Sequence, residues 1–138
     1  MKQLTTSLIV IATICAAWAS TVAAAERPAD RVVAMYFHRT QRCPTCIKMG
    51  SYTEEAVKKG FEKEVKAGTV EFHYVDFQDK KNAAIAKAYK ITGPALIVAK
   101  VKENKVKEYK NLKDIWAKVA KKPEFIKYVR ESVRAQVK

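Results

Sequence analysis

Two spacings of hydrophobic residues alternate along residues 26–138 and predict the order of the secondary structure. Near-continuous apolar runs rich in β-branched and aromatic residues predict strands, and apolar positions three or four residues apart predict helices. Strands are expected at Arg31–Phe37, Val70–Phe77, Ile91–Val98 after an initial turn, and Lys105–Tyr109. Helices are expected from the cysteine pair to a stop at Gly68, and at Ala83–Tyr89, Leu112–Ala120 and Glu124–Val137.

The order of these elements (β, α, β, α, β, β, α, α) predicts an α/β fold. Arg31–Phe37 is apolar along almost its whole length, which is typical of a strand covered on both faces. The early alternation of strands and helices favours parallel pairing, and a hairpin across Glu103–Asn104 adds an antiparallel strand. We expect a mixed central sheet of about four strands with helices on both faces.

Some single residues predict local features of these elements. Gly60 lies inside the first predicted helix, where it weakens the helix and permits close packing on the sheet. Asp79 is an expected N-cap, and Asn111 with Asp114 resembles a capping box that opens the next helix. Trp116 is expected to pack in the core.

Residues 1–25 differ from the rest of the chain. Lys2 precedes an uncharged, apolar stretch from Gln3 to Ala25 that ends in small residues. This pattern predicts a secretory signal cleaved after Ala25, and its interspersed Ser and Thr residues favour that interpretation over an uncleaved membrane anchor. Cys15 would be removed with the signal, or lie in lipid if the anchor is kept. We expect residues 26–138 to form one periplasmic or secreted domain, or a membrane-anchored one facing the periplasm.

Residues 26–138 are strongly basic, with 26 Lys and Arg against 14 Asp and Glu, a net charge of +12. This balance favours anionic partners such as a membrane surface, an envelope polymer or an acidic protein. Lysines spread over a solvated surface give the same charge without any partner. Nucleic acid is not an expected partner, because the chain is expected to be exported and has no recognisable binding motif.

The segment Cys43-Pro44-Thr45-Cys46 joins the first predicted strand to the first predicted helix. With Cys43 as N-cap, Pro44 takes the first helical position, where its missing N–H costs nothing. The helix N-terminus favours the thiolate of Cys43 and so lowers its pKa. Cys46 is expected one turn further in and more buried. This asymmetry assigns Cys43 the attack on a disulfide and Cys46 the resolution of the mixed disulfide.

Positive charge is concentrated around this pair. Arg39, Arg42 and Lys48 lie nearby, and no acidic residue occurs between Asp30 and Glu54. We expect these cations to lower the pKa of the reactive thiol further. Because they favour the reduced thiolate, they favour an oxidant or isomerase-like protein over a general reductase.

The strand, the Cys-x-x-Cys helix, the second βα unit and the Gly-Pro turn before a final hairpin and helix resemble the thioredoxin fold over residues 31–137. The resemblance implies Cys43 as nucleophile, Cys46 as resolving thiol, and Thr92, Gly93 and Pro94 as the loop that binds the substrate backbone. The corresponding thioredoxin loop is one residue longer, so the resemblance leaves the isomer of Pro94 open.

Within that superfamily, Tyr36–Cys46 and Asn111–Trp116 are similar to a bacterial group labelled nitrophenyl-compound nitroreductase subunit, ArsF type. A nitroreductase needs a flavin or a comparable electron carrier, and the chain has no nucleotide-binding loop. The resemblance therefore implies an electron-relay role with a membrane or periplasmic partner. No cofactor is expected beyond the Cys43–Cys46 disulfide.

Two departures from thioredoxins affect the expected chemistry. Arg42 occupies the place of an aromatic residue before the first cysteine, and Arg31–Phe37 lacks the buried carboxylate that helps to deprotonate the second thiol. We therefore expect water or another group to accept the proton of Cys46, and slower or more specialised exchange than in a general reductase.

A Cys-x-x-Cys pair has two other ordinary uses besides thiol-disulfide exchange. A structural disulfide across so short a loop stabilises little. Four-coordinate structural zinc needs further Cys or His ligands besides this pair, and only His38 and His73 could supply them. His38 is expected to be a hydrogen-bonded surface residue and His73 a sheet residue, so no metal site is assigned, although copper(I) could bind two thiolates. The sequence predicts a thiol-disulfide oxidoreductase acting on protein or small-molecule thiols and disulfides. The alternative is a non-catalytic thioredoxin-fold module that docks partners or handles metal through a basic face.

Overall fold

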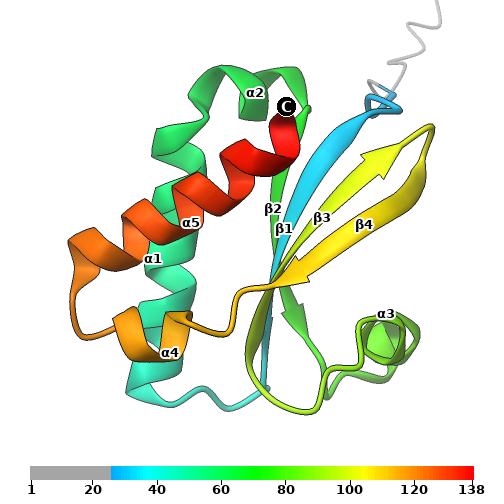
Figure 1. The fold of residues 1–138 in the computed structure, drawn as a ribbon. Helices are drawn as coiled ribbons and strands as arrows, with labels where there is room; N and C mark the ends of the chain where they lie inside the picture. Colours follow the sequence, from blue (N-terminus) through cyan, green and yellow to red (C-terminus); the bar gives the residue numbers. More distant parts are fainter. Residues whose placement is uncertain (1–25) are drawn as a thin grey trace, which may run out of the picture.

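The computed structural model describes residues 26–138 and has an α/β fold with a mixed four-stranded sheet, consistent with a thioredoxin-like fold (Figure 1). The strands are β1 (Arg31–His38), β2 (Val70–Asp76), β3 (Ala95–Lys102) and β4 (Lys105–Asn111). The helices are α1 (Pro44–Gly60), α2 (Glu62–Ala67), α3 (Ala83–Ala88), α4 (Ile115–Lys118) and α5 (Lys122–Val137), with a 3₁₀ turn η1 (Lys80–Asn82). The predicted fold class is therefore confirmed.

The strands lie in the order β2-β1-β3-β4. β1 pairs in parallel with β2, so α1 and α2 form the crossover between them, and β1 pairs antiparallel with β3. In this register Tyr36 lies beside Tyr74, and Phe37 lies beside Ala95. The carboxyl end of β1, which leads to the cysteines, therefore meets the beginning of β3.

β1 is covered on both faces, as predicted from its continuous hydrophobicity. On one face Ala34 and Tyr36 belong to a cluster with buried residues of α1 and α5, such as Met49 and Phe125. On the other face Met35 and Phe37 contribute to a smaller cluster against which residues of the α3 region pack. Figure 1 shows α1 and α5 on one side of the sheet and α3 on the other.

The first predicted helix is divided in two at Phe61, which has non-helical dihedral angles (φ −139°, ψ 42°). Gly60 ends α1, and its packing partner differs from the prediction: a Cβ atom there would lie 2.7 Å from Nε of Arg130 on α5. The glycine therefore permits close approach between two helices rather than between a helix and the sheet. Gly68 ends α2 with φ +74°, as expected of a C-terminal glycine.

One of the two predicted caps is present. The carboxylate of Asp79 accepts a hydrogen bond from the backbone N–H of Lys81 at 3.0 Å and caps η1. The capping box at Asn111 is wrong, because Asn111 pairs with Ile97 as the last residue of β4. Asp114 is the N-cap of the short helix α4, but its side chain makes no capping hydrogen bond.

β4 is an edge strand whose residues are all exposed. Its hairpin turn places Glu103 (φ 52°) and Asn104 (φ 60°) in the left-handed region, which suits the twist of a tight hairpin. Asp30 accepts a hydrogen bond from the N–H of Glu103 at 2.9 Å and ties the segment before β1 to this turn.

The predicted signal or anchor at residues 1–25, with Cys15, lies outside the described residues. Within residues 26–138 none of the helices has the length and apolar character that a bilayer span requires.

Candidate redox site

The site begins where β1 ends. A short loop of exposed residues follows His38, and Cys43 adopts an extended conformation (φ −72°, ψ 159°) as the N-cap of α1. Pro44 occupies the first turn, where its ring is compatible with the helix and no N–H is lost from the hydrogen-bond ladder. The predicted arrangement of a strand that delivers Cys43 to a helix N-terminus is therefore present.

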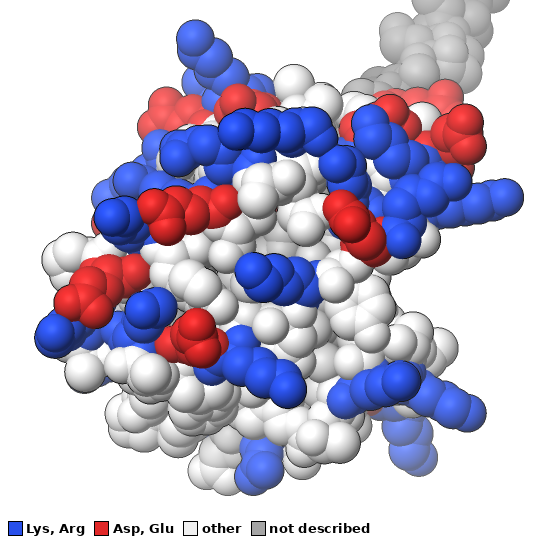
Figure 2. All heavy atoms as spheres, viewed as in Figure 1, with Lys and Arg blue, Asp and Glu red and all other residues white. Residues whose placement is uncertain are grey.

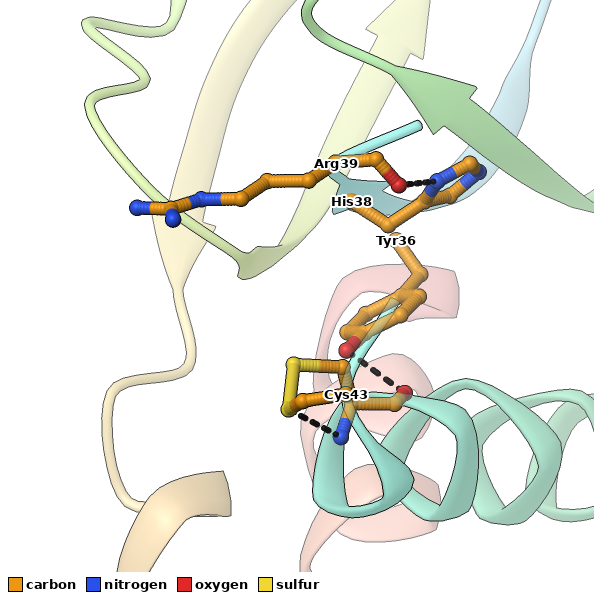
Figure 3. The surroundings of a disulfide bond; sticks show 5 residues. Tyr36, His38, Arg39 and Cys43 are labelled. Carbon is orange, nitrogen blue, oxygen red and sulfur yellow. Dashed lines mark hydrogen bonds between the residues drawn. A yellow bond between two sulfur atoms is a disulfide. The ribbon is translucent and has the colours of Figure 1, made fainter. Parts of the chain in front are cut away.

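Cys43 and Cys46 form a disulfide with their Cα atoms 5.1 Å apart (Figure 3). Cys43 is exposed, whereas only 7% of Cys46 is accessible. The backbone N–H of Cys46 donates a hydrogen bond to Sγ of Cys43 at 3.1 Å. A partner can therefore reach the first sulfur, and a backbone donor already points at the atom that becomes a thiolate on reduction.

Tyr36 anchors the buried half of the pair. Its side chain is fully buried on β1, and its hydroxyl donates a hydrogen bond to the carbonyl of Cys46 at 2.8 Å (Figure 3). Burial raises the pKa of Tyr36 to about 12, which keeps the hydroxyl protonated and donating at neutral pH. Gly50, one turn further along α1, makes room for this contact, since a Cβ atom there would lie 2.7 Å from the Tyr74 ring and 3.0 Å from the Tyr36 ring.

Arg42 is held beside the cysteines by an aromatic ring. Its guanidinium carbon lies 5.4 Å from the centre of the Tyr74 ring, a cation–π contact. The Tyr74 hydroxyl in turn donates a hydrogen bond to Glu54 at 3.0 Å. Burial, followed by this bond to the Glu54 carboxylate, raises the pKa of Tyr74 to about 12. Arg42 therefore rests on a ring that is itself fixed to α1.

A surface hollow adjoins the exposed sulfur. It is lined by Arg39, Gln41, Arg42, Cys43 and Gln78. In Figure 3 the side chain of Arg39 runs to one side of the disulfide and does not point at it. The backbone N–H of Thr40 donates to Oε1 of Gln78 at 3.0 Å, which fixes the loop before Cys43 to the residues after β2.

Asp76 completes this connection between the two loops. Its carboxylate accepts hydrogen bonds from the hydroxyl of Thr40 at 2.7 Å and from the N–H of Gln78 at 2.9 Å. The Thr40 hydrogen bond is the largest cause that lowers the pKa of Asp76, so the residue stays ionised. The hollow is therefore built on an ordered network of loop contacts.

Thr92, Gly93 and Pro94 lie directly before β3, at the sheet edge where β1 ends. They line a second hollow that continues to Asn111 and Trp116. The Gly93–Pro94 peptide bond is trans. The structure thus places the predicted substrate loop at the same end of the sheet as Cys43, but in a different hollow from Arg39 and Arg42.

The other predicted residues fall in varied surroundings. Trp116 is 48% exposed and lines the second hollow, so its prediction as a core residue is wrong; its short helix turns it outward. Lys48 is exposed on the first turns of α1.

His38 donates from Nδ1 to the carbonyl of Arg39 at 2.9 Å, and His73 lies on β2 with Nε2 2.7 Å from Glu71. Within residues 26–138 there is no group of three or more His, Cys, Asp or Glu placed to hold a metal ion.

Four residues of the site have no counterpart among the predicted ones: Tyr36, Gly50, Tyr74 and Gln78. Tyr36 and Tyr74 occur in apolar strand patterns that give no sign of a polar role, and Gln78 lies more than thirty residues from Cys43.

A comparison with family models finds no match for this chain, and a comparison with curated proteins finds none either.

Proposed function

We propose that this protein is an exported thiol-disulfide oxidoreductase with Cys43 as nucleophile and Cys46 as resolving thiol. The observation that carries the proposal is the unequal exposure of the two sulfurs: Cys43 is open to solvent at the N-terminus of α1, and Cys46 is buried beneath it. A disulfide needed only for stability gains nothing from an exposed, helix-capping sulfur.

The reaction follows from this arrangement. In the reduced protein the Cys43 thiolate attacks one sulfur of a substrate disulfide, the substrate S–S bond breaks, and one substrate thiolate leaves. Cys46 then loses its proton to water, attacks Sγ of Cys43, and releases the second substrate thiolate as the Cys43–Cys46 disulfide forms. Two electrons pass from the protein dithiol to the substrate, and the reverse sequence oxidises a substrate dithiol.

The direction of electron flow under physiological conditions is part of the proposal. The cations near Cys43 and the Cys46 N–H favour the thiolate, so they favour the reduced protein and an oxidant or isomerase-like role. Equilibration with glutathione buffers should give a reduction potential above that of thioredoxin, about −270 mV. A value near or below that would assign a reductant role instead.

From the likeness to the ArsF-type group we infer only an electron-relay role. The redox pair supplies two electrons without a flavin, so a membrane or periplasmic partner would provide or accept them. A nitroreductase activity of the isolated chain is not part of the proposal.

The alternative is a non-catalytic module that docks a partner through a basic face. Figure 2 shows Lys and Arg spread over the viewed face with Asp and Glu between them. Ion pairs such as Lys122 with Glu55, at 2.7 Å, neutralise part of this charge. On this face the dispersion favours a solvated surface over a basic docking site.

Substitution of each cysteine separates the two functions. Cys43→Ser should abolish insulin disulfide exchange and trap no partner, and Cys46→Ser should accumulate mixed disulfides on Cys43. A binding module would instead keep its partner in the Cys43→Ser variant.

Alkylation with iodoacetamide as a function of pH tests the same proposal without a substrate. In the reduced protein, Cys43 should react half-maximally at a pH below about 8.5, the ordinary pKa of a thiol, and faster than Cys46. Equal, slow reaction of both sulfurs at neutral pH would contradict the proposed enzyme.

A further inference from the structure

Two guanidinium groups beside Cys43 have no carboxylate partner. Among residues 26–138 the ion pairs engage other cations, and neither Arg39 nor Arg42 lies within 4.0 Å of an acidic oxygen. Both line the hollow that opens at Cys43. Positive charge in this hollow is therefore available to an incoming group.

The two arginines are placed differently relative to the sulfur. Arg42 directly precedes Cys43 and is held over the Tyr74 ring, so a carboxylate can meet it without the full cost of ordering a mobile side chain. Arg39 runs to one side of the disulfide without pointing at it (Figure 3), so its guanidinium group lines the hollow where a bound molecule can meet it.

A neutral donor lines the same hollow. Oε1 of Gln78 accepts the hydrogen bond from the Thr40 N–H, so its side-chain amide group retains N–H donors for another partner. The hollow thus places two guanidinium groups and one amide beside the exposed sulfur, and these three groups are donors that match the acceptor oxygens of a carboxylate.

The nearby carboxylates are already engaged. Asp76 accepts hydrogen bonds from Thr40 and Gln78, and Glu54 accepts from Tyr74 and pairs with Lys58. Both carboxylates make loop and helix contacts that shape the hollow. Neither Asp76 nor Glu54 lines it.

We propose that this hollow is a carboxylate subsite, so that Cys43 reacts preferentially with small disulfides and thiols that carry a carboxylate within a few bonds of sulfur. This substrate class rests on the proposed exchange function. With such a disulfide, the Cys43 thiolate forms a mixed disulfide with the carboxylate-bearing half, the substrate S–S bond breaks, and the other half leaves as a thiolate. The guanidinium groups hold the carboxylate of the half that stays.

The test measures this first step in the Cys46→Ser variant, which stops at the mixed disulfide. The probes are 3,3′-dithiodipropionate, which carries a carboxylate a few bonds from each sulfur, and bis(2-hydroxyethyl) disulfide, which is neutral. Mass spectrometry of the peptide that contains Cys43 gives the rate constant for each probe. The ratio of the two rate constants cancels any change in the thiolate fraction of Cys43.

Arg39→Gln/Arg42→Gln should lower the ratio for anionic over neutral disulfide by about tenfold, an effect of the size that two exposed charge pairs supply. Lys63→Gln/Lys66→Gln makes the same change in net charge on α2, which lies at the other end of the molecule, and should leave the ratio within about twofold of the parent value (Figure 1).

A second variant tests the subsite without removing an arginine. Gln78→Glu keeps an oxygen to accept the Thr40 N–H but puts a negative charge into the hollow, so it should also lower the ratio. An unchanged ratio in both site variants, with normal reaction of the neutral probe, would overturn the carboxylate subsite alone. Failure of the parent Cys46→Ser protein to react with either probe would overturn the exchange function itself.

Discussion

At the scale of single residues, the contact between Tyr36 and Cys46 links the core to the redox pair. The Tyr36 ring is fully buried, and its hydroxyl reaches the carbonyl of Cys46 at the first turn of α1. A hydroxyl in a core is retained only when it has a hydrogen-bond partner. Tyr36 therefore fixes Cys46 relative to the sheet, which keeps its sulfur beneath Cys43.

Tyr36→Phe should lower the free energy of unfolding by about 1 kcal/mol, because one buried hydrogen bond is lost while the ring is kept. Denaturant unfolding of the oxidised protein measures this change. Tyr109→Phe, at an exposed ring on β4, is the control and should have no comparable effect.

Tyr36→Phe should also change how the stability of the protein depends on pH. The pKa of Tyr36 is raised to about 12 in the folded protein, against 10.0 for an ordinary tyrosine, so the unfolded chain ionises first. The stability that protonated Tyr36 supports is complete below pH 10.0 and is lost as the pH rises towards 12. Tyr36→Phe should lose less stability than the parent over this interval. If both proteins lost the same stability between pH 10.0 and 12, the raised pKa of buried Tyr36 would not be the cause of the loss.

At the scale of elements, the glycine at the end of α2 and the glycine before the start of β3 show when a glycine is required. Gly68 ends α2 with φ +74°, a conformation that disfavours a Cβ atom, and that atom would also lie 3.1 Å from Cδ of Pro28. Gly93 precedes β3, its φ lies outside the left-handed region, and its missing Cβ would meet no atom within 4 Å. The two glycines, both half-buried, therefore have different roles.

Gly68→Ala should lower the free energy of unfolding by about 1–2 kcal/mol, the cost of an L-residue in the left-handed region. Gly93→Ala should change it by less than about 0.5 kcal/mol, because the unfolded chain also loses freedom. Chemical denaturation of both variants measures the difference. An equal loss of unfolding free energy in the two variants would show that the backbone is under the same constraint at Gly68 and at Gly93.

At the scale of the whole molecule, α1 and α5 cover one face of the sheet and are tied together at their surface. Lys122 of α5 donates to Glu55 of α1 at 2.7 Å, and its Nζ lies 5.2 Å from the centre of the Tyr52 ring. Arg130 donates to the carbonyl of Ala56 at 3.2 Å, beside Gly60. The carboxyl-terminal helix thereby supports the helix that carries the cysteines.

Lys122→Gln should lower the melting temperature at pH 7 by about 1–2 °C, since an exposed ion pair contributes little. The Lys122 hydrogen bond lowers the pKa of Glu55, so the contribution is present above the ordinary value of 4.5 and is lost as acid protonates Glu55. The same hydrogen bond raises the pKa of Lys122, so the contribution is also lost above 10.5.

Calorimetry at pH 7 and at about pH 2 checks this dependence, because the parent and variant curves should coincide in acid. Lys127 on the same helix pairs with Glu131 of α5, at 3.9 Å, so Lys127→Gln serves as the control. A difference between parent and Lys122→Gln that persists in acid would assign the effect to packing on Tyr52 instead of to the ion pair.

Local rules determined most of the fold and the centre of the site. The apolar run of β1, the cysteines with Pro44 at the start of α1, and the stop at Gly68 depend on residues close together in sequence. Their hydrophobic period and capping preferences therefore predicted the element order, the mixed sheet and the unequal exposure of Cys43 and Cys46.

Tertiary contacts decided the surroundings of that centre. Parallel pairing of β1 with β2 places Tyr74 beside Tyr36, and this juxtaposition positions Arg42; it also brings Gln78 close to the loop before Cys43. Sheet pairing held Asn111 in β4 instead of in a helix cap. These features need residues that are far apart in the chain to meet, and a pattern of neighbouring residues carries no information about which distant side chains share a surface.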